Sequence, residues 1–219
     1  LSISRVDPLP HQLEAIYDYL LKLARVRFLL ADDAGAGKTI MAGLLIRELQ
    51  LRGLAERILI VCPANLSFQW QRELKEKFDE KFLVLKGGDI RDQFGVNQWL
   101  EQKKIITSLD LAKRTEILPG LRQVQWDLVI VDEAHRLKNR STLAWKLVNS
   151  IQKTFLLMLT ATPVQNSLEE LYNLVTLLRP GHLKTQKAFK DEFITRGNPT
   201  DPRNREKLRQ LLKEVMVRN

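Results

Sequence analysis

A short segment at residues 35–39, Gly-Ala-Gly-Lys-Thr, contains the residue types that hold phosphate groups. Glycines let backbone N–H groups approach phosphate oxygens, a lysine meets the terminal phosphates, and a hydroxyl binds magnesium where a helix begins. The segment follows a short apolar run and precedes a helical pattern, which is the usual context of such loops. We expect Lys38 to bind phosphate and Thr39 to bind magnesium. The expected nucleotide-binding residues of the loop are Gly35, Ala36, Gly37, Lys38, Thr39 and Ile40.

One position of this loop departs from the strict phosphate-loop pattern. The pattern has glycine six residues before the lysine, where this chain has Asp32. An ordinary glycine-containing turn is the alternative. Because acids repel phosphates, we expect Asp32 and Asp33 to turn away from the nucleotide, and Asp33 to orient the loop or nearby basic side chains.

A second motif supports a nucleotide site. The apolar run at residues 127–131 ends in Asp132, Glu133, Ala134 and His135. An acid at the carboxyl end of a neighbouring strand can reach the magnesium ion held by Thr39, and the next acid can orient the water that attacks the γ-phosphate. The alternative is that both acids only cap the following turn. Together the motifs predict an ATP and Mg²⁺ site, with Lys38, Asp132 and Glu133 as its catalytic residues.

The elements that must position these residues follow an alternating pattern. Short runs rich in Val, Ile, Leu and Phe alternate with segments of helical period, which is typical of a parallel sheet covered by helices. We therefore predict an α/β fold with a mostly parallel sheet of about six to seven strands. The runs lie at residues 27–31, 57–62, 81–85, 104–107, 127–131 and 154–160.

Five segments have the apolar spacing of amphipathic helices: 10–24, 39–49, 64–78, 141–151 and 167–178. In the third, Trp70 lies in a stripe of apolar residues four positions apart, so a core position is favoured over base stacking. In the last, Ser167 and Glu170 have the spacing of a capping box, and Arg179-Pro180-Gly181 ends the helix. We expect no strand after Gly181, only two short helices around a loop at residues 197–202.

The charge of the chain is basic, with 35 Lys and Arg against 26 Asp and Glu. A net charge of +9 suits a polyanionic partner. Residues 184–218 hold ten basic and five acidic residues, which either contact nucleic acid or form a solvated face. No run of eighteen apolar residues occurs, and the single cysteine, Cys62, excludes an internal disulfide. These features predict a monomeric, cytoplasmic protein without a membrane partner, and one that extends beyond both ends of this chain.

The order of the motifs along nearly the whole chain resembles the first RecA-like lobe of superfamily-two helicases, specifically the Swi/Snf-related translocases of double-stranded DNA. The resemblance rests on "LPHQLEAI", "DDAGAGKT", "ILIVCPANLSFQWQREL", "IITSLDLAKR", "WDLVIVDEAHRLKN" and "LMLTATPVQNSLEELYNLVTLLRPG". Ala161 and Ala34 depart from the usual eukaryotic residues and indicate a distant bacterial or archaeal type. The resemblance implies a RecA-like ATP-binding lobe at residues 1–180 and a helical extension at 181–219.

The resemblance also implies roles for individual residues. Gln12 would hydrogen-bond adenine, and Pro63, Asn65, Thr107 and Ser108 would contact the nucleic acid. For Thr107 and Ser108, phosphate contact is favoured over helix capping. Coupling between the nucleotide and the nucleic acid would involve His135, Thr160 and Thr162, whose threonine hydroxyls could bond toward the Asp-Glu-Ala-His segment or form a local turn.

The same resemblance implies that ATP hydrolysis requires a second lobe that these residues do not contain. Nothing after Gly181 resembles the second RecA-like lobe, which in this family supplies arginine fingers that accelerate hydrolysis by about 10³ to 10⁵. We therefore expect these 219 residues to bind nucleotide weakly and to hydrolyse it negligibly by themselves. Two alternatives are the motor lobe of an RNA or single-strand helicase or of a restriction system, and a non-catalytic, nucleotide-gated module that binds nucleic acid.

Overall fold

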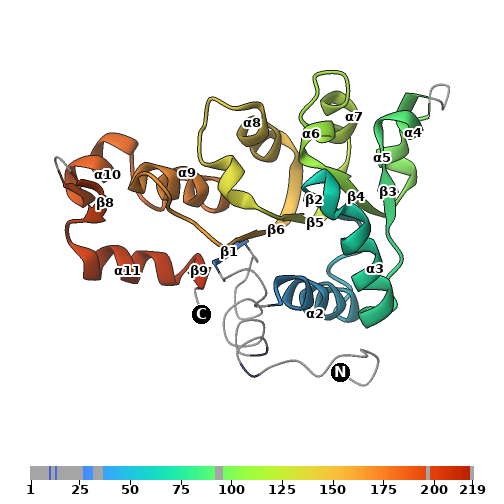
Figure 1. Ribbon diagram of the computed structural model, residues 1–219, viewed down its shortest axis with the longest axis horizontal. Coiled ribbons are helices and arrows are strands. Elements are labelled where there is room, and N and C mark those ends of the chain that lie inside the picture. Colours follow the sequence, from blue (N-terminus) through green and yellow to red (C-terminus); the bar gives the residue numbers. More distant parts are fainter. Residues whose placement is uncertain are drawn as a thin grey trace.

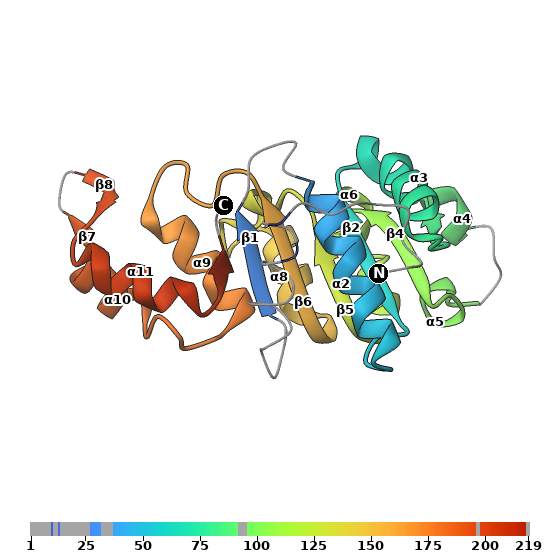
Figure 2. The same cartoon turned by 90° about the horizontal axis from the view of Figure 1, so that it is seen from below.

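A seven-stranded parallel sheet forms the centre of the molecule in the computed structural model, which describes Pro10, Leu13 and residues 27–31, 37–91, 96–195 and 198–217 (Figures 1 and 2). The strand order is β3-β4-β2-β5-β6-β1-β9, and every neighbouring pair is parallel. The strands are β1 (Arg27–Ala31), β2 (Ile58–Cys62), β3 (Leu83–Leu85), β4 (Lys104–Ser108), β5 (Gln125–Val131), β6 (Gln152–Thr160) and β9 (Met216–Val217).

Each of the six apolar runs forms a strand, so the predicted α/β fold with a mostly parallel sheet is confirmed. Strands covered on both faces carry apolar side chains in both directions, and all five residues of β2 are buried. Alternate residues contribute to two separate hydrophobic clusters. Leu59 and Val129 belong to one cluster, whereas Ile60 and Ile130 belong to the other. The sheet therefore divides the core into two layers.

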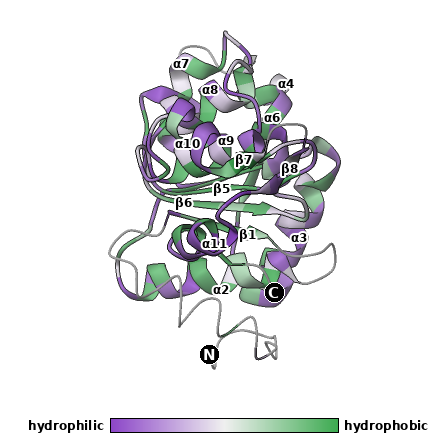
Figure 3. Cartoon of the chain, turned by 90° about the vertical axis from the view of Figure 1, so that its left-hand side faces the viewer, coloured by the Kyte–Doolittle hydropathy of each residue, from purple (hydrophilic) through white to green (hydrophobic). Residues whose placement is uncertain are grey.

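Helices cover both faces of the sheet (Figure 3). α2 and α3 pack on one face, and α6, α8 and α9 contribute to the cluster on the other. The described helices are α2 (Lys38–Leu51), α3 (Ser67–Phe78), α4 (Gly87–Arg91), α5 (Gln98–Glu101), α6 (Leu109–Ala112), α7 (Leu118–Arg122), α8 (Leu143–Ser150), α9 (Leu168–Leu178), α10 (Gln186–Phe193) and α11 (Arg205–Lys213), with the 3-10 helices η2 (Ala64–Leu66) and η3 (Ala134–Leu137). The predicted helix at 10–24 lies outside the described residues except for Pro10 and Leu13. In the part of the chain that is described, no helix has the length and apolarity needed to cross a membrane.

The expectation that no strand follows Gly181 is wrong. β7 (Ile194–Thr195) and β8 (Asn198–Pro202) pair antiparallel, and β9 joins the main sheet beside β1. The Leu29 backbone N–H donates to the Val215 carbonyl (2.8 Å), which helps to satisfy the outer edge of β1. β7 and β9 have two residues each, which is too short to show a period. β8 has five residues, but its sequence Asn-Pro-Thr-Asp-Pro is typical of a loop rather than a strand. The two predicted helices form as α10 and α11.

The predicted capping box at α9 is also wrong in detail. Ser167 occupies the N-cap position but makes no side-chain cap bond. The Glu170 carboxylate instead accepts from the backbone N–H groups of Gln165 (2.7 Å) and Asn166 (3.1 Å), which precede the cap. The carboxylate thus orders the loop before α9 rather than the first turn of the helix.

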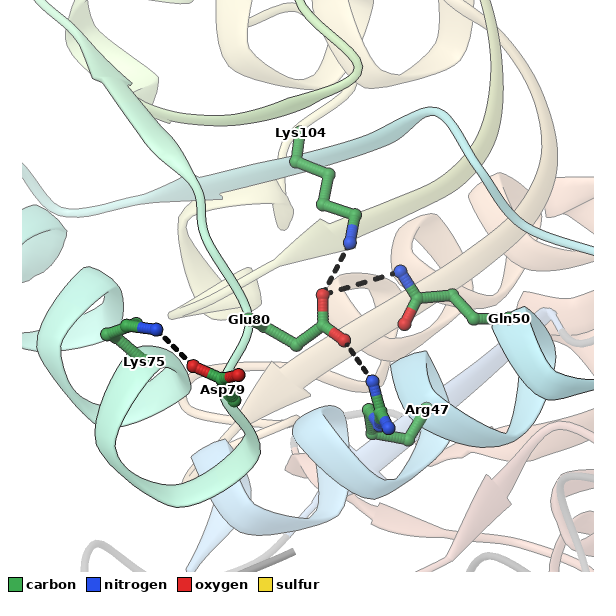
Figure 4. A network of polar contacts seen from close by, with 6 residues as sticks. All are labelled: Arg47, Gln50, Lys75, Asp79, Glu80 and Lys104. Atoms are coloured by element: carbon green, nitrogen blue, oxygen red, sulfur yellow. Dashed lines mark hydrogen bonds and ion pairs between the residues drawn. The ribbon is translucent and has the colours of Figure 1, made fainter. Parts of the chain in front are cut away.

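A buried carboxylate joins three elements at the amino end of β4 (Figure 4). The side chain of Glu80 is only 3% exposed and accepts from Arg47 Nη1 (2.8 Å), Lys104 Nζ (2.5 Å) and the Gln50 amide. Burial alone would raise the pKa of Glu80, but the hydrogen bonds from Lys104 and Arg47 outweigh burial and hold the pKa below 4.5. This network ties α2 to β4 and to the segment after α3, at the edge of the sheet away from the predicted nucleotide site.

Candidate nucleotide-binding site

The two chemical motifs meet at the carboxyl edge of the sheet. β6 lies between β5 and β1, with Ala31 beside Thr160 and Val131 beside Met158. The segments that leave these three strands therefore begin next to one another: the loop into α2, the Asp132–His135 segment and the Thr160–Thr162 segment. Ligands of open α/β sheets bind in this position, outside the carboxyl ends of the strands.

The start of α2 presents a helix N-terminus suited to an anion. Gly37 holds the N-cap position with φ 75°, a left-handed conformation that glycine adopts without steric cost. No side chain caps the helix, and its first turn contains no acid that would compete with phosphate. Lys38, Thr39 and Ile40 are half-buried there. Gln12, Gly35 and Ala36, like Asp32 and Asp33, lie outside the described residues, so their roles stay predictions.

Asp132 is held from both sides. Its side chain is buried, its Oδ1 accepts from the Glu133 backbone N–H (2.8 Å), and its Oδ2 accepts from the Trp70 indole Nε1–H (2.9 Å). Trp70 is buried on α3, which confirms the predicted core position. Its hydrogen bond to Asp132 was not predicted, because apolar spacing in a helix says nothing about where the indole N–H points.

Glu133 has an unusual backbone. Its φ of 51° lies in the left-handed region, which non-glycine residues rarely adopt and which costs of order 1–2 kcal/mol. Such strain persists where the surrounding structure fixes it, commonly at functional sites. The half-buried carboxylate lies 3.1 Å from His135 Nδ1, but the two are not aligned as a hydrogen bond. The contact is an ion pair only if the imidazole is protonated.

The hydroxyls of Thr160 and Thr162 bond locally. Thr160 is fully buried, and its Oγ1 accepts from the Thr162 backbone N–H (3.2 Å). The Thr162 hydroxyl accepts from Gln165 Nε2 (3.0 Å). This is the local turn that the sequence left open, and neither of these two bonds is made toward the Asp-Glu-Ala-His segment. The coupling role of His135, Thr160 and Thr162 stays a prediction.

Two residues that the sequence analysis missed connect these segments. Lys138, directly after η3, donates to Gln165 Oε1 (2.8 Å) and pairs with Glu170 Oε1 (3.1 Å). The Asn173 side chain donates to the Lys138 carbonyl (2.8 Å), which fixes the same residue from a second side. The sequence marked Glu170 only as a capping-box residue, and nothing marked Lys138, because charged residues near a loop are ordinary in sequence.

The predicted nucleic-acid contacts divide into accessible and inaccessible residues. Asn65 is exposed and Pro63 half-buried in the loop after β2, while half-buried Ser108 caps α6 by accepting from the Leu111 N–H (3.1 Å). Thr107 is fully buried, and its hydroxyl donates to the Leu85 carbonyl (3.4 Å). The structure does not support a phosphate contact by Thr107, because the side chain is fully buried and its hydroxyl already donates to Leu85. The other three contacts stay predictions.

Cys62 ends β2 as a buried thiol. Burial raises the pKa of the thiol to about 11, although a hydrogen bond with Ser67 opposes the rise. The group is therefore a packing residue rather than a nucleophile or a metal ligand.

The donor groups fit a magnesium ion that is shared with phosphates. Among the described residues there is no cluster of three or more His, Cys, Asp or Glu side chains that could hold a metal alone. Magnesium in nucleotide sites needs only one or two protein oxygens, since phosphates and water complete its octahedron. The Asp132 carboxylate accepts hydrogen bonds from two neutral donors, the Trp70 indole and the Glu133 backbone N–H, and among the described residues it forms no ion pair.

Comparison with known proteins agrees with this arrangement. The family model of the SNF2-related domain matches residues 11–219. An uncharacterized ATP-dependent helicase, YqhH of Bacillus subtilis, is 41% identical over the whole chain, which spans 37% of that protein. Chromodomain-helicase-DNA-binding protein 6 of Homo sapiens is 31% identical over 89% of the chain and 8% of its own length.

Solved structures show the same fold. The Sulfolobus solfataricus SWI2/SNF2 ATPase core in complex with double-stranded DNA superposes with a TM-score of 0.84 at 24% identity, covering 99% of this chain and 45% of that one. The ATPase core domain without DNA gives a TM-score of 0.81. The resemblance that the motifs suggested is thus confirmed, and the chain belongs to the SNF2-related domain family.

Proposed function

We propose that this chain is the first RecA-like lobe of an ATP-driven motor that translocates along double-stranded DNA. The observation that supports the proposal is the strand order, in which β6 alone separates β1, the strand before Lys38 and Thr39, from β5, the strand before Asp132 and Glu133. The chain spans less than half of its relatives, so the activity belongs to a longer protein.

Each of the four residues has a role that its chemistry allows. Lys38 would bind the β- and γ-phosphates, while Thr39 and Asp132 would hold magnesium. The ion would neutralise the charge that develops on the phosphates. Glu133, which follows Asp132 in the sequence and has a strained backbone, would orient the attacking water. Gln12 and the backbone of residues 35–37 would complete the nucleotide site.

A second lobe is required for turnover. An arginine supplied across the cleft accelerates phosphoryl transfer by about 10³ to 10⁵. These 219 residues alone should therefore bind nucleotide and hydrolyse it negligibly. Fast hydrolysis by the 219-residue chain, stimulated by DNA, would contradict this division of roles.

Double-stranded DNA is the preferred substrate in the proposal. The structural relative at a TM-score of 0.84 was solved with double-stranded DNA, and a curated relative is a chromodomain-helicase-DNA-binding protein. The basic balance of +9 suits a polyanion. Within the extension, several cations are already paired, as Lys184 and Lys207 are with Glu192, so a solvated face is the better interpretation of that segment.

The test compares nucleic acids. ATP hydrolysis by the full-length protein should rise with duplex DNA more than with single strands or RNA of equal length. Greater stimulation by RNA or single strands would favour the helicase alternative. Nucleotide-dependent binding without any hydrolysis would favour the non-catalytic module.

A further inference from the structure

Trp70 makes a contact that the proposed reaction does not yet use. Its indole N–H donates to Asp132 Oδ2 at 2.9 Å, between two side chains that are both more than nine-tenths buried. We propose that Trp70 is a positioning residue, which orients the Asp132 carboxylate for magnesium and links α3 to the metal ligand. The inference rests on the proposed function, because it concerns the same nucleotide site.

Two hydrogen bonds from neutral donors restrain the Asp132 carboxylate. Oδ1 accepts from the Glu133 N–H and Oδ2 from Trp70, so rotation of the carboxylate about its bond to Cβ would break both hydrogen bonds. Each oxygen has two lone pairs, and one on each oxygen remains for a cation. Both donors are neutral, whereas a lysine or arginine in the same place would compete with magnesium for the negative charge.

A comparison within the fold shows that a buried indole does not demand such a partner. Trp126 is fully buried in β5, the strand that leads to Asp132, and its Nε1 has no hydrogen-bond partner within the described part of the chain. Packing alone therefore holds an indole in this core. The hydrogen bond of Trp70 adds a directional contact to the carboxylate beyond packing.

The position of Trp70 on α3 gives the contact a second consequence. The helix begins at Ser67, immediately after the Pro63–Leu66 loop that is predicted to touch the nucleic acid. Trp70, Leu74 and Phe78 anchor one face of α3 in the core. A shift of the loop on nucleic-acid binding would therefore move the indole N–H relative to Asp132. Trp70 therefore joins the helix that follows this loop to the Asp132 carboxylate through a side-chain hydrogen bond.

The test uses Trp70→Phe in the full-length protein, with Trp126→Phe as the matched control. Both variants lose a buried indole, but only the first loses a hydrogen bond to Asp132. The readout is the dissociation constant of a non-hydrolysable ATP analogue, titrated with Mg²⁺ and, separately, in excess EDTA. Replacement of Trp70 by 3-benzothienylalanine, which keeps the ring volume and lacks the N–H, serves if the phenylalanine variant does not fold.

We expect Trp70→Phe to weaken Mg²⁺-dependent binding by about 10- to 100-fold, as loss of a ligand's hydrogen-bond partner commonly does, with binding in EDTA unchanged. Trp126→Phe should match the wild type in both conditions. Equal Mg²⁺ dependence in the two variants would overturn the role of Trp70 while leaving the proposed function intact. Absence of nucleotide binding by the wild type would instead overturn the proposed function itself.

Discussion

Replacing Glu80 with glutamine tests the network that ties α2 to the sheet. The variant keeps the size of the side chain and one acceptor oxygen, but removes the negative charge that faces Arg47 and Lys104 (Figure 4). The matched control is Asp79→Asn, the adjacent acid, which is 73% exposed and pairs with Lys75. Asp79 has φ 53°, and asparagine tolerates that conformation well, so the control changes only the charge.

The magnitude follows from burial on the two sides of the pair. Breaking a fully buried ion pair costs about 3–5 kcal/mol, mostly because the remaining charge loses its compensation. The side chains of Arg47 and Lys104 are 25% and 28% exposed, so water can partly rehydrate them. Glutamine also continues to accept hydrogen bonds. We therefore expect Glu80→Gln to lower the free energy of unfolding by about 1.5–3 kcal/mol, and Asp79→Asn by at most about 0.5 kcal/mol.

The assay is urea unfolding of the 219-residue chain, followed by circular dichroism at several pH values. Because the pKa of Glu80 is lowered in the folded state, its stabilising contribution is complete above its unfolded pKa near 4.5 and is lost as pH falls through the folded pKa. The difference between wild type and Glu80→Gln should therefore shrink in acid. Equal effects of the two variants at neutral pH would refute the assignment of a stabilising role to this network.

Three further predictions concern packing, reactivity and loop order. A Cβ on Gly43 would lie 2.2 Å from the Phe78 ring, so Gly43→Ala should destabilise the fold by about 1–3 kcal/mol. The control is Gly88→Ala, whose Cβ would meet no atom within 4 Å and which should not destabilise the fold. Equal stability of the two variants in urea unfolding would contradict the close contact of α2 and α3. With its pKa raised to about 11, the Cys62 thiol should react with a disulfide reagent at pH 8 about 100-fold more slowly than a free thiol. Unfolding in urea should remove this protection, and fast labelling of the folded chain would show that the thiol is accessible. Glu170→Ala should speed hydrogen exchange at the backbone amides of residues 165 and 166, because both amides donate to the Glu170 carboxylate. Unchanged exchange rates would mean that other contacts order the loop.

The layered fold could be predicted because six of the seven strands of the central sheet lie in apolar runs of four or more residues. Runs such as 57–62 and 127–131 are buried on both faces, and continuous apolar sequence is the direct record of that burial. The two-residue strand β9 was not predicted, because its pairing with β1 depends on the path of the chain. One bond of this pairing runs from the Leu29 N–H to the Val215 carbonyl. A contact between residues so far apart leaves no local signal.

The site could be predicted to the level of motifs but not of contacts. Spacing selected Lys38, Thr39, Asp132 and Glu133 as candidates, because phosphate loops and strand-end acids have fixed local geometry, and their roles stay predictions. The bond from Trp70 to Asp132 joins residues 62 positions apart, so only the fold reveals it. Thr107 was predicted to touch phosphate, but its side chain is fully buried and its hydroxyl donates to the Leu85 carbonyl.

The most direct test of the central claim is ATP hydrolysis by the full-length protein and its Glu133→Gln variant, with and without duplex DNA. We expect duplex DNA to stimulate the wild type, and the variant to lose about 10²- to 10⁴-fold of that activity, the usual contribution of a group that positions or deprotonates the attacking water. Nucleotide binding by the variant should remain. Undiminished hydrolysis by Glu133→Gln would contradict the assignment of this edge of the sheet as the site of ATP hydrolysis.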